Sequence, residues 1–144
     1  MKNKIDFSEV PYHYSLCLNH QCTKASTCLR QLSEQCAPET IEYWTIISPK
    51  HQSTIKGDCP YYRSSTKVRY AKGFMNIMEN MPIKQSRKVI SSLISTFSRR
   101  TYYRIRKGER PLSPDEQKEI IKILKFHGVA EPYEFDAFFE EYDW

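Results

Sequence analysis

Apolar residues recur at helical spacing through the second half of the chain. One stripe consists of Val68, Ala71, Phe74, Met75 and Met78, and a second, after Pro82, consists of Val89, Ile90, Leu93, Ile94 and Phe97. A third, after Pro132, consists of Phe135, Phe138, Phe139 and Tyr142. Because residues three and four apart lie on one face of a helix, each stripe predicts an amphipathic helix.

Two further helices are indicated by residues that favour helix ends. Ser98 can cap a helix whose buried side is Tyr102 and Ile105, and Gly108 suits the position just after its end. The run Ser113-Pro114-Asp115-Glu116 then combines a capping Ser, a Pro suited to the first turn and a Glu that completes a capping box. The second half of the chain is therefore expected to form a compact five-helix bundle.

The first part of the chain is expected to be rich in loops. Its prolines, which break it into short pieces, are Pro11, Pro38, Pro49 and Pro60. Short helices are predicted at about Lys24–Gln35 and Pro38–Ile47. The expected fold is mainly α, with a small loop-rich Cys module over residues 1–66 followed by the five-helix bundle over residues 67–144.

Positive charge is concentrated in the middle of the sequence. The 144 residues carry a formal net charge of +5. Residues 61–110 hold 13 Lys and Arg against 2 Asp and Glu, whereas residues 1–60 hold 6 of each and residues 111–144 hold 3 and 9. Such a cationic stretch is typical of a surface that binds a polyanion, so nucleic acid is the leading candidate partner.

The segment from Ser98 to Arg110 resembles the recognition helix of the Cro and phage-repressor helix-turn-helix family, also called the xenobiotic-response-element type. In that family a Ser or Thr caps the helix, two apolar residues three apart bury it, and a Gly-x-Arg turn follows. These places are taken here by Ser98, Tyr102, Ile105 and Gly108-Glu109-Arg110. The resemblance covers about residues 68–130. The family usually has a Gly in the turn before this helix, whereas Ser95-Thr96-Phe97-Ser98 contains none.

This resemblance implies a DNA-binding protein, with regulation of transcription as its expected role. A recognition helix enters the major groove when one side packs and the other is long, polar and cationic. By resemblance, the residues that approach base edges are Arg99, Arg100 and Tyr103, and those nearer the phosphates are Arg104, Lys107 and Arg110. Duplex DNA is the expected nucleic acid, and a homodimer is the usual arrangement for tight operator binding.

Two other interpretations of the basic helix remain open. The helix could dock on an acidic partner, which would make the chain a protein–protein adaptor, or it could be a solvated face of the bundle. The acidic and aromatic segment at residues 131–144 has alternatives of its own. It could close the bundle through its Phe stripe, shield the basic stretch, or bind a partner protein.

All five cysteines lie in the first part of the chain, where a metal would stabilise a segment with little core. The expected ligands are Cys17, Cys22, Cys28 and Cys59, with His20 and Cys36 as substitutes for one of them. Zinc is the expected metal because it binds four thiolates in a tetrahedron. An iron–sulfur cluster, which would indicate a redox-sensing regulator, is an alternative, and Cys59-Pro60 is a pairing common in cluster-binding sets. Unliganded thiols are the third interpretation.

The remaining features concern compartment and chemistry. The first residues lack the apolar region and cleavage site of a secretory signal, and no run of about 20 apolar residues could span a bilayer. A cytoplasmic protein outside the membrane is therefore expected, and disulfides are not expected there. The sequence contains no nucleophile elbow, no phosphate-binding Gly-rich loop and no His-Glu-x-x-His pattern, so an enzyme is not expected.

Overall fold

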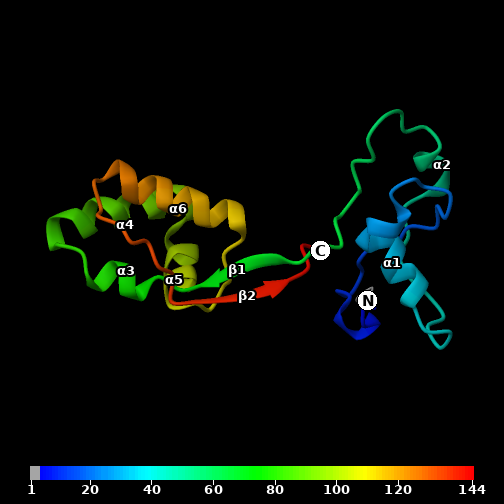
Figure 1. Cartoon of the computed structure of the whole chain (residues 1–144), viewed down its shortest axis with the longest axis horizontal. Helices are drawn as coiled ribbons and strands as arrows, with labels where there is room; N and C mark the ends of the chain where they lie inside the picture. The colour runs from blue at the N-terminus through cyan, green and yellow to red at the C-terminus, as the bar shows by residue number, and fades with distance from the viewer. Residues whose placement is uncertain (1–3) are drawn as a thin grey trace. The chain divides into compact units, whose positions relative to one another are not determined.

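The computed structural model describes residues 4–144, which form two compact units. One unit contains the chain up to Lys67 together with Tyr142–Trp144, and the other is Val68–Glu141. Figure 1 shows the two units coloured along the chain. The last three residues lie with the first unit, whereas the sequence assigns them to the bundle. Their place follows from packing, because Tyr142 is buried with Ile5 and Leu29.

Short elements joined by long loops make up the first unit. They are the 3-10 turns η1 (Phe7–Glu9) and η2 (Ala25–Thr27) and the helices α1 (Leu29–Cys36) and α2 (Pro49–Gln52). Two isolated backbone bridges connect the loops, a parallel one between Leu16 and Ile46 and an antiparallel one between Cys28 and Ser64. Helical structure is therefore a small part of this unit, as its prolines predict.

One of the two helices predicted here is wrong and the other is shorter than predicted. The segment Pro38–Ile47 is not helical, because its end pairs with the chain around Leu16. The amide of Leu16 donates to the carbonyl of Thr45 at 2.9 Å, and the amide of Ile47 donates to the carbonyl of Leu16 at 3.0 Å. The helix predicted from Lys24 is divided at Cys28, whose extended backbone separates η2 from α1.

Helices and a small sheet form the second unit. The helices are α3 (Met75–Glu79), α4 (Ile83–Phe97), α5 (Arg99–Lys107) and α6 (Pro114–Phe126). The strands β1 (Val68–Lys72) and β2 (Ala137–Glu141) are antiparallel, with Val68 opposite Glu141 and Lys72 opposite Ala137. The sheet thus joins the two ends of the unit, and all four helices lie between its strands in sequence (Figure 1).

The prediction of helices is wrong for the two segments that form this sheet. The stripe from Val68 begins as strand β1 and becomes helical only in α3, and the stripe after Pro132 contains strand β2. Pairing between the two segments explains both differences, since Tyr70 stacks on Phe139 with ring centroids 5.4 Å apart. The second unit is mainly helical with a small antiparallel sheet, rather than a five-helix bundle.

The apolar faces predicted for α4 and α5 pack into the core of the second unit, and α6 contributes to the same core, although its Phe126, also expected on the apolar side, is 84% exposed. The side chains concerned are Val89 and Leu93 of α4, Tyr102 and Ile105 of α5, and Ile120 and Leu124 of α6, each at most 1% exposed. Phe74 and Leu112 lie in the same core, equally buried. No helix formed by residues 4–144 has the length and apolar character needed to span a membrane.

Candidate functional site

The candidate nucleic-acid interface is helix α5, and both of its ends are fixed as the sequence predicts. Ser98, the one residue between α4 and α5, accepts a hydrogen bond through Oγ from the amide of Thr101 at 3.4 Å. Gly108 follows the helix with φ of 84°, a left-handed backbone conformation that would be strained in a residue with a side chain. Helix α5 packs against α4, the helix that precedes it (Figure 1). The local sequence therefore determines where this helix begins and ends.

The two sides of α5 differ sharply in exposure. Tyr102 and Ile105 are both 0% exposed, and the Tyr102 ring lies 6.2 Å from that of Phe74. Burial raises the pKa of the Tyr102 hydroxyl, and the nearby charge of Arg106 opposes that shift. On the other side, the exposed residues are Arg99, Arg100, Tyr103, Arg104 and Lys107. The structure thus brings five of the six predicted DNA-contacting residues together on one side of α5.

The sixth predicted residue, Arg110, has a different partner. Its guanidinium contacts the carboxylate of Glu116 twice, at 2.6 Å and 3.4 Å. Glu116 also accepts a hydrogen bond from the hydroxyl of Ser113 at 3.2 Å. Arg110 therefore joins the turn after α5 to the first turn of α6. The sequence predicts Glu116 as a capping residue, but nothing in the spacing indicates that it also pairs with Arg110.

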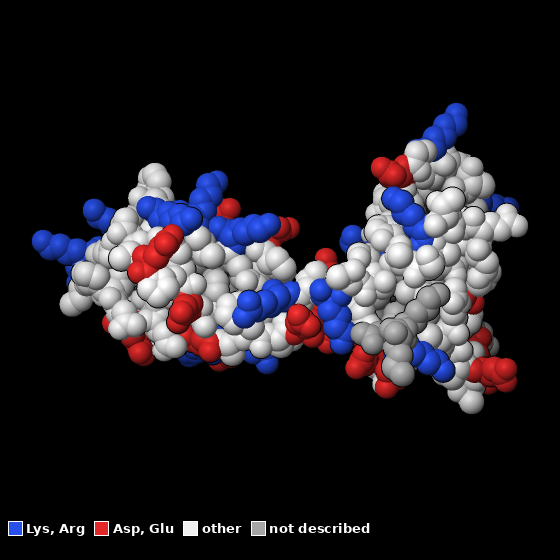
Figure 2. Space-filling view, in the orientation of Figure 1, with Lys and Arg blue, Asp and Glu red and all other residues white. Residues whose placement is uncertain are grey.

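Positive charge on this part of the second unit is largely uncompensated. Residues 83–107, which span α4 and α5, contain eight Lys and Arg and no Asp or Glu. Within the described part of the chain, no ion pair involves the exposed cations of α5. Lys84, Arg87 and Lys88 of α4 are exposed as well, and sequence reasoning did not single them out. Figure 2 shows Lys and Arg side chains projecting over α4 and α6 on the face in view.

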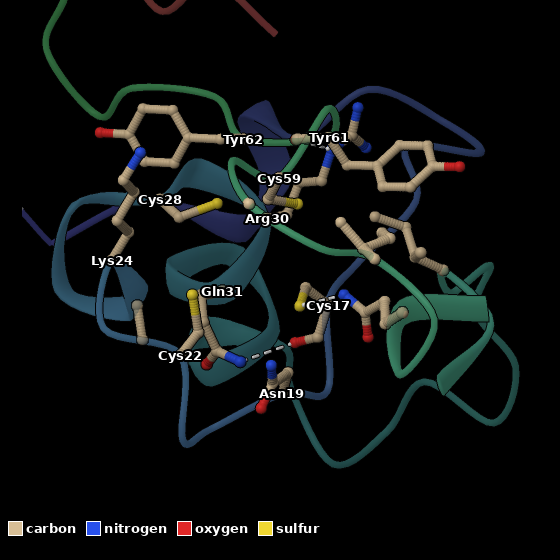
Figure 3. Close-up of a pocket in the computed structure, with 15 residues that line it drawn as sticks. Cys17, Asn19, Cys22, Lys24, Cys28, Arg30, Gln31, Cys59, Tyr61 and Tyr62 are labelled. Carbon is tan, nitrogen blue, oxygen red and sulfur yellow. Dashed lines mark hydrogen bonds between the residues drawn. The ribbon is translucent and has the colours of Figure 1, made fainter. Parts of the chain in front are cut away.

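A second candidate site is a cavity in the first unit with a volume of about 180 Å³. The cysteines that line it are Cys17, Cys22, Cys28 and Cys59, which are the four predicted metal ligands. Figure 3 shows their labelled side chains around a common space. The two substitutes lie elsewhere: Cys36 ends α1 beside the small core, and His20 lies 3.7 Å from a carboxylate oxygen of Glu34.

Helix α1 holds three of these cysteine segments together. The Arg30 side chain donates from Nε to the carbonyl of Tyr61 at 2.8 Å and from a terminal nitrogen to the carbonyl of Ser15 at 2.7 Å. Gln31, which is 1% exposed, donates to the carbonyl of Cys17 at 3.0 Å. These bonds connect α1, which follows Cys28, to the segments that carry Cys17 and Cys59. Arg30 therefore links the segment before Cys17 to the segment after Cys59.

Backbone and side-chain bonds complete the cavity. The amide of Leu29 donates to the carbonyl of Arg63 at 2.7 Å, which fixes the Cys28 segment beside the chain that follows Cys59. The side-chain amide of Gln52 in α2 donates to the sulfur of Cys17 at 3.1 Å. The first unit is thus organised around the thiols although its elements are short.

The thiols surround a common space without meeting at one point. All five cysteines are free thiols. Among residues 4–144, no group of three or more His, Cys, Asp or Glu side chains is arranged to hold a metal ion. The arrangement brings the four predicted ligands to one cavity, and their spacing there differs from that of a closed tetrahedral site.

Comparison with known proteins places the chain in a family. Residues 1–144 match the family DUF6078. The chain belongs to that family. It is described as a family of unknown function. No curated protein and no solved structure matches the chain.

In this DUF6078 chain, three polar side chains position the cysteine segments of the first unit. Sequence reasoning missed Arg30, Gln31 and Gln52, which hold the cysteine segments in place. A weak signal existed for the first two, because both polar residues lie in α1 within three positions of Cys28. Gln52 had no such signal, since 34 residues separate it from the Cys17 that it contacts.

Proposed function

We propose that the second unit binds duplex DNA through α5 and acts as a regulator of transcription. The observation that carries this proposal is the division of α5 into a fully buried side and an exposed side that is cationic. A helix of this kind can pack on its own unit and still present long basic side chains to the major groove. The resemblance of Ser98–Arg110 to a Cro-type recognition helix supports the same assignment.

Each exposed residue of α5 has a role within this proposal. Arg99, Arg100 and Tyr103 lie toward the N-terminal end of the helix, which in this kind of motif contacts base edges. An Arg that bridges a guanine discriminates it by about 1–3 kcal/mol. Arg104 and Lys107 contact phosphates and add affinity without sequence information.

Arg110 has a structural role in this proposal instead of a phosphate contact. Its bidentate pairing with Glu116 links α5 to α6 and so fixes the direction in which the basic side of α5 points. Planar guanidinium–carboxylate pairs of this kind are geometrically specific, which suits a positioning role.

Binding of the full chain to a labelled duplex of mixed sequence tests the proposal. Log affinity should fall linearly with log salt, because bound Lys and Arg release counterions from the phosphates. The double variant Arg104→Ala/Lys107→Ala should weaken binding and reduce the salt slope by about 2. The matched control Lys122→Ala/Lys125→Ala removes two exposed charges from α6 and should have a smaller effect on both quantities. Absence of binding at low salt, or equal losses in both variants, would contradict the proposal.

Sequence selection from a random duplex pool tests the base contacts. The chain should enrich a preferred sequence, and Arg99→Ala/Arg100→Ala should relax that preference more than it reduces binding to unselected DNA. If the chain instead retains an acidic protein and no DNA, the adaptor interpretation is correct and the regulator proposal is wrong.

A further inference from the structure

The cavity of the first unit is lined by four thiols, which are its candidate metal ligands. They come from four separate places in the chain, and the cavity wall contains no Asp, Glu or His. Thiolates without carboxylate or imidazole donors favour soft centres, namely zinc, copper(I) and iron–sulfur clusters. The thiols therefore favour one of these three kinds of metal centre as the occupant of the cavity.

The arrangement of the thiols distinguishes between a single metal ion and a centre of several atoms. In a tetrahedral zinc site each sulfur lies about 2.3 Å from the ion, so neighbouring sulfurs are about 3.8 Å apart and no free space remains between them. Here no three of the His, Cys, Asp or Glu side chains of residues 4–144 are arranged to hold a single metal ion, although four thiols line the one cavity. A centre of several atoms can reach thiols that stand apart.

The surroundings of the cavity also suit an anionic, sulfur-rich centre. Arg30 lies in the wall, and its charge opposes the negative charge that four thiolates bring, whereas Lys24, also in the wall, is paired with Asp58 at 3.5 Å. The amide of Gln52 already donates to the Cys17 sulfur, and hydrogen bonds to ligating sulfurs are among the features that set cluster potentials. Ile47 and Ile55 add apolar side chains to the wall.

We propose that Cys17, Cys22, Cys28 and Cys59 hold an iron–sulfur cluster in this cavity. Each thiol releases its proton to solvent as its sulfur binds iron, and the iron and inorganic sulfide are supplied from outside the chain. The cluster cross-links four loop segments and so stabilises a unit whose own core is small. This proposal is independent of DNA binding, because it concerns only residues of the first unit.

Metal and sulfide analysis of the full chain, purified without oxygen, tests the proposal directly. Iron and acid-labile sulfide should be present in equal amounts, at two or four of each per chain, with visible absorption that bleaches on reduction. A chain isolated without iron should acquire the same composition when it is incubated without oxygen with ferrous iron, ferric iron and sulfide, the ferric iron being the source of the oxidised metal in the cluster. One zinc per chain without iron, or no uptake of either component, would overturn the proposal.

Single substitutions locate the centre. Cys22→Ser and Cys59→Ser are the best variants because both residues are half-buried, whereas Cys17 and Cys28 are only 8% exposed. Each should lower bound iron several-fold. Cys36→Ser is the matched control, since that thiol is also half-buried but lies outside the cavity, and it should retain the iron. Equal iron in all three variants, with the fold intact by circular dichroism, would contradict the assignment of ligands.

Loss of iron and loss of DNA binding are separate readouts of the full chain. If no cluster is found, the salt titration of duplex binding still tests the proposed function. Conversely, absence of DNA binding would not alter the expected iron content.

Discussion

Ser98 has two opposing effects on the stability of the second unit. Its backbone has φ of 77° and ψ of 157°, a region that glycine adopts readily and that strains other residues by about 1–3 kcal/mol. Its hydroxyl, however, accepts the amide of Thr101 and so caps α5. In the family that this segment resembles, a glycine usually occupies the turn before the recognition helix. Here a serine holds the turn and supplies the cap.

Two substitutions at Ser98 should separate these effects. Ser98→Gly relieves the backbone strain and, because glycine is a tolerated cap, should stabilise the second unit by about 1 kcal/mol. Ser98→Ala removes the cap and retains the strain, so it should destabilise the unit by about 1 kcal/mol. Urea unfolding followed by circular dichroism at the helical band measures both, since most helical residues lie in this unit. Equal destabilisation by the two variants would show that this backbone is not strained in solution.

At the scale of elements, α3 depends on a residue far away in sequence. Asp136 accepts the amides of Met75 and Asn76 at 2.9 Å and 3.1 Å, and its own amide donates to the carbonyl of Gly73 at 2.9 Å. A helix of five residues is too short to be stable alone. The approach to Asp136 also requires Gly73, because an added Cβ would lie 2.6 Å from a carboxylate oxygen.

Replacement of Asp136 should therefore loosen α3. Asp136→Ala leaves two amides at the helix start without their acceptor, and we expect a loss of about 1–2 kcal/mol in the free energy of unfolding. Glu134→Ala is the control, because it removes the same charge from an exposed side chain two residues away. Its effect should stay within about 0.5 kcal/mol. Similar losses in both variants would mean that general charge, and not the capping contact, is responsible.

At the scale of the whole molecule, the chain returns to its first unit at its last three residues. Tyr142 is 5% exposed, and Trp144 lies edge-on to both Tyr14 and Tyr142 at centroid distances of 5.2 Å and 5.4 Å. The sheet of the second unit ends at Glu141, immediately before this return. The small core of the first unit is thus built from both ends of the described chain.

Tyr142→Ala should consequently weaken the first unit and not the second. Removal of a buried aromatic side chain costs about 3 kcal/mol, which is large for a core of this size. Tryptophan fluorescence reports on the first unit, because both tryptophans, Trp44 and Trp144, belong to it, while the helical dichroism reports mainly on the second. The control Tyr12→Ala changes a side chain that is 90% exposed and should leave the midpoints of both unfolding transitions unchanged. A parallel shift of the two signals would show that the units unfold together.

The sequence by itself determined those features whose causes are local. The ends of α5 and α6 were predictable because a capping hydroxyl and the amide that it accepts are three residues apart. The buried faces of the central helices were predictable because helical periodicity repeats within a few turns. The concentration of positive charge likewise needed no knowledge of distant contacts.

Only the tertiary structure decided features that depend on partners far along the chain. Strand β1 pairs with β2 across about 70 residues, so the same apolar stripes that suit helices became a sheet. The segment that ends at Ile47 is not helical because it pairs with the chain around Leu16, and Arg110 is held by Glu116 because two helix ends meet. The gathering of four thiols around one cavity follows from hydrogen bonds of Arg30 and Gln31 to distant carbonyls. Periodicity and spacing carry no information on such contacts, since they form only when the folded chain brings the partners together.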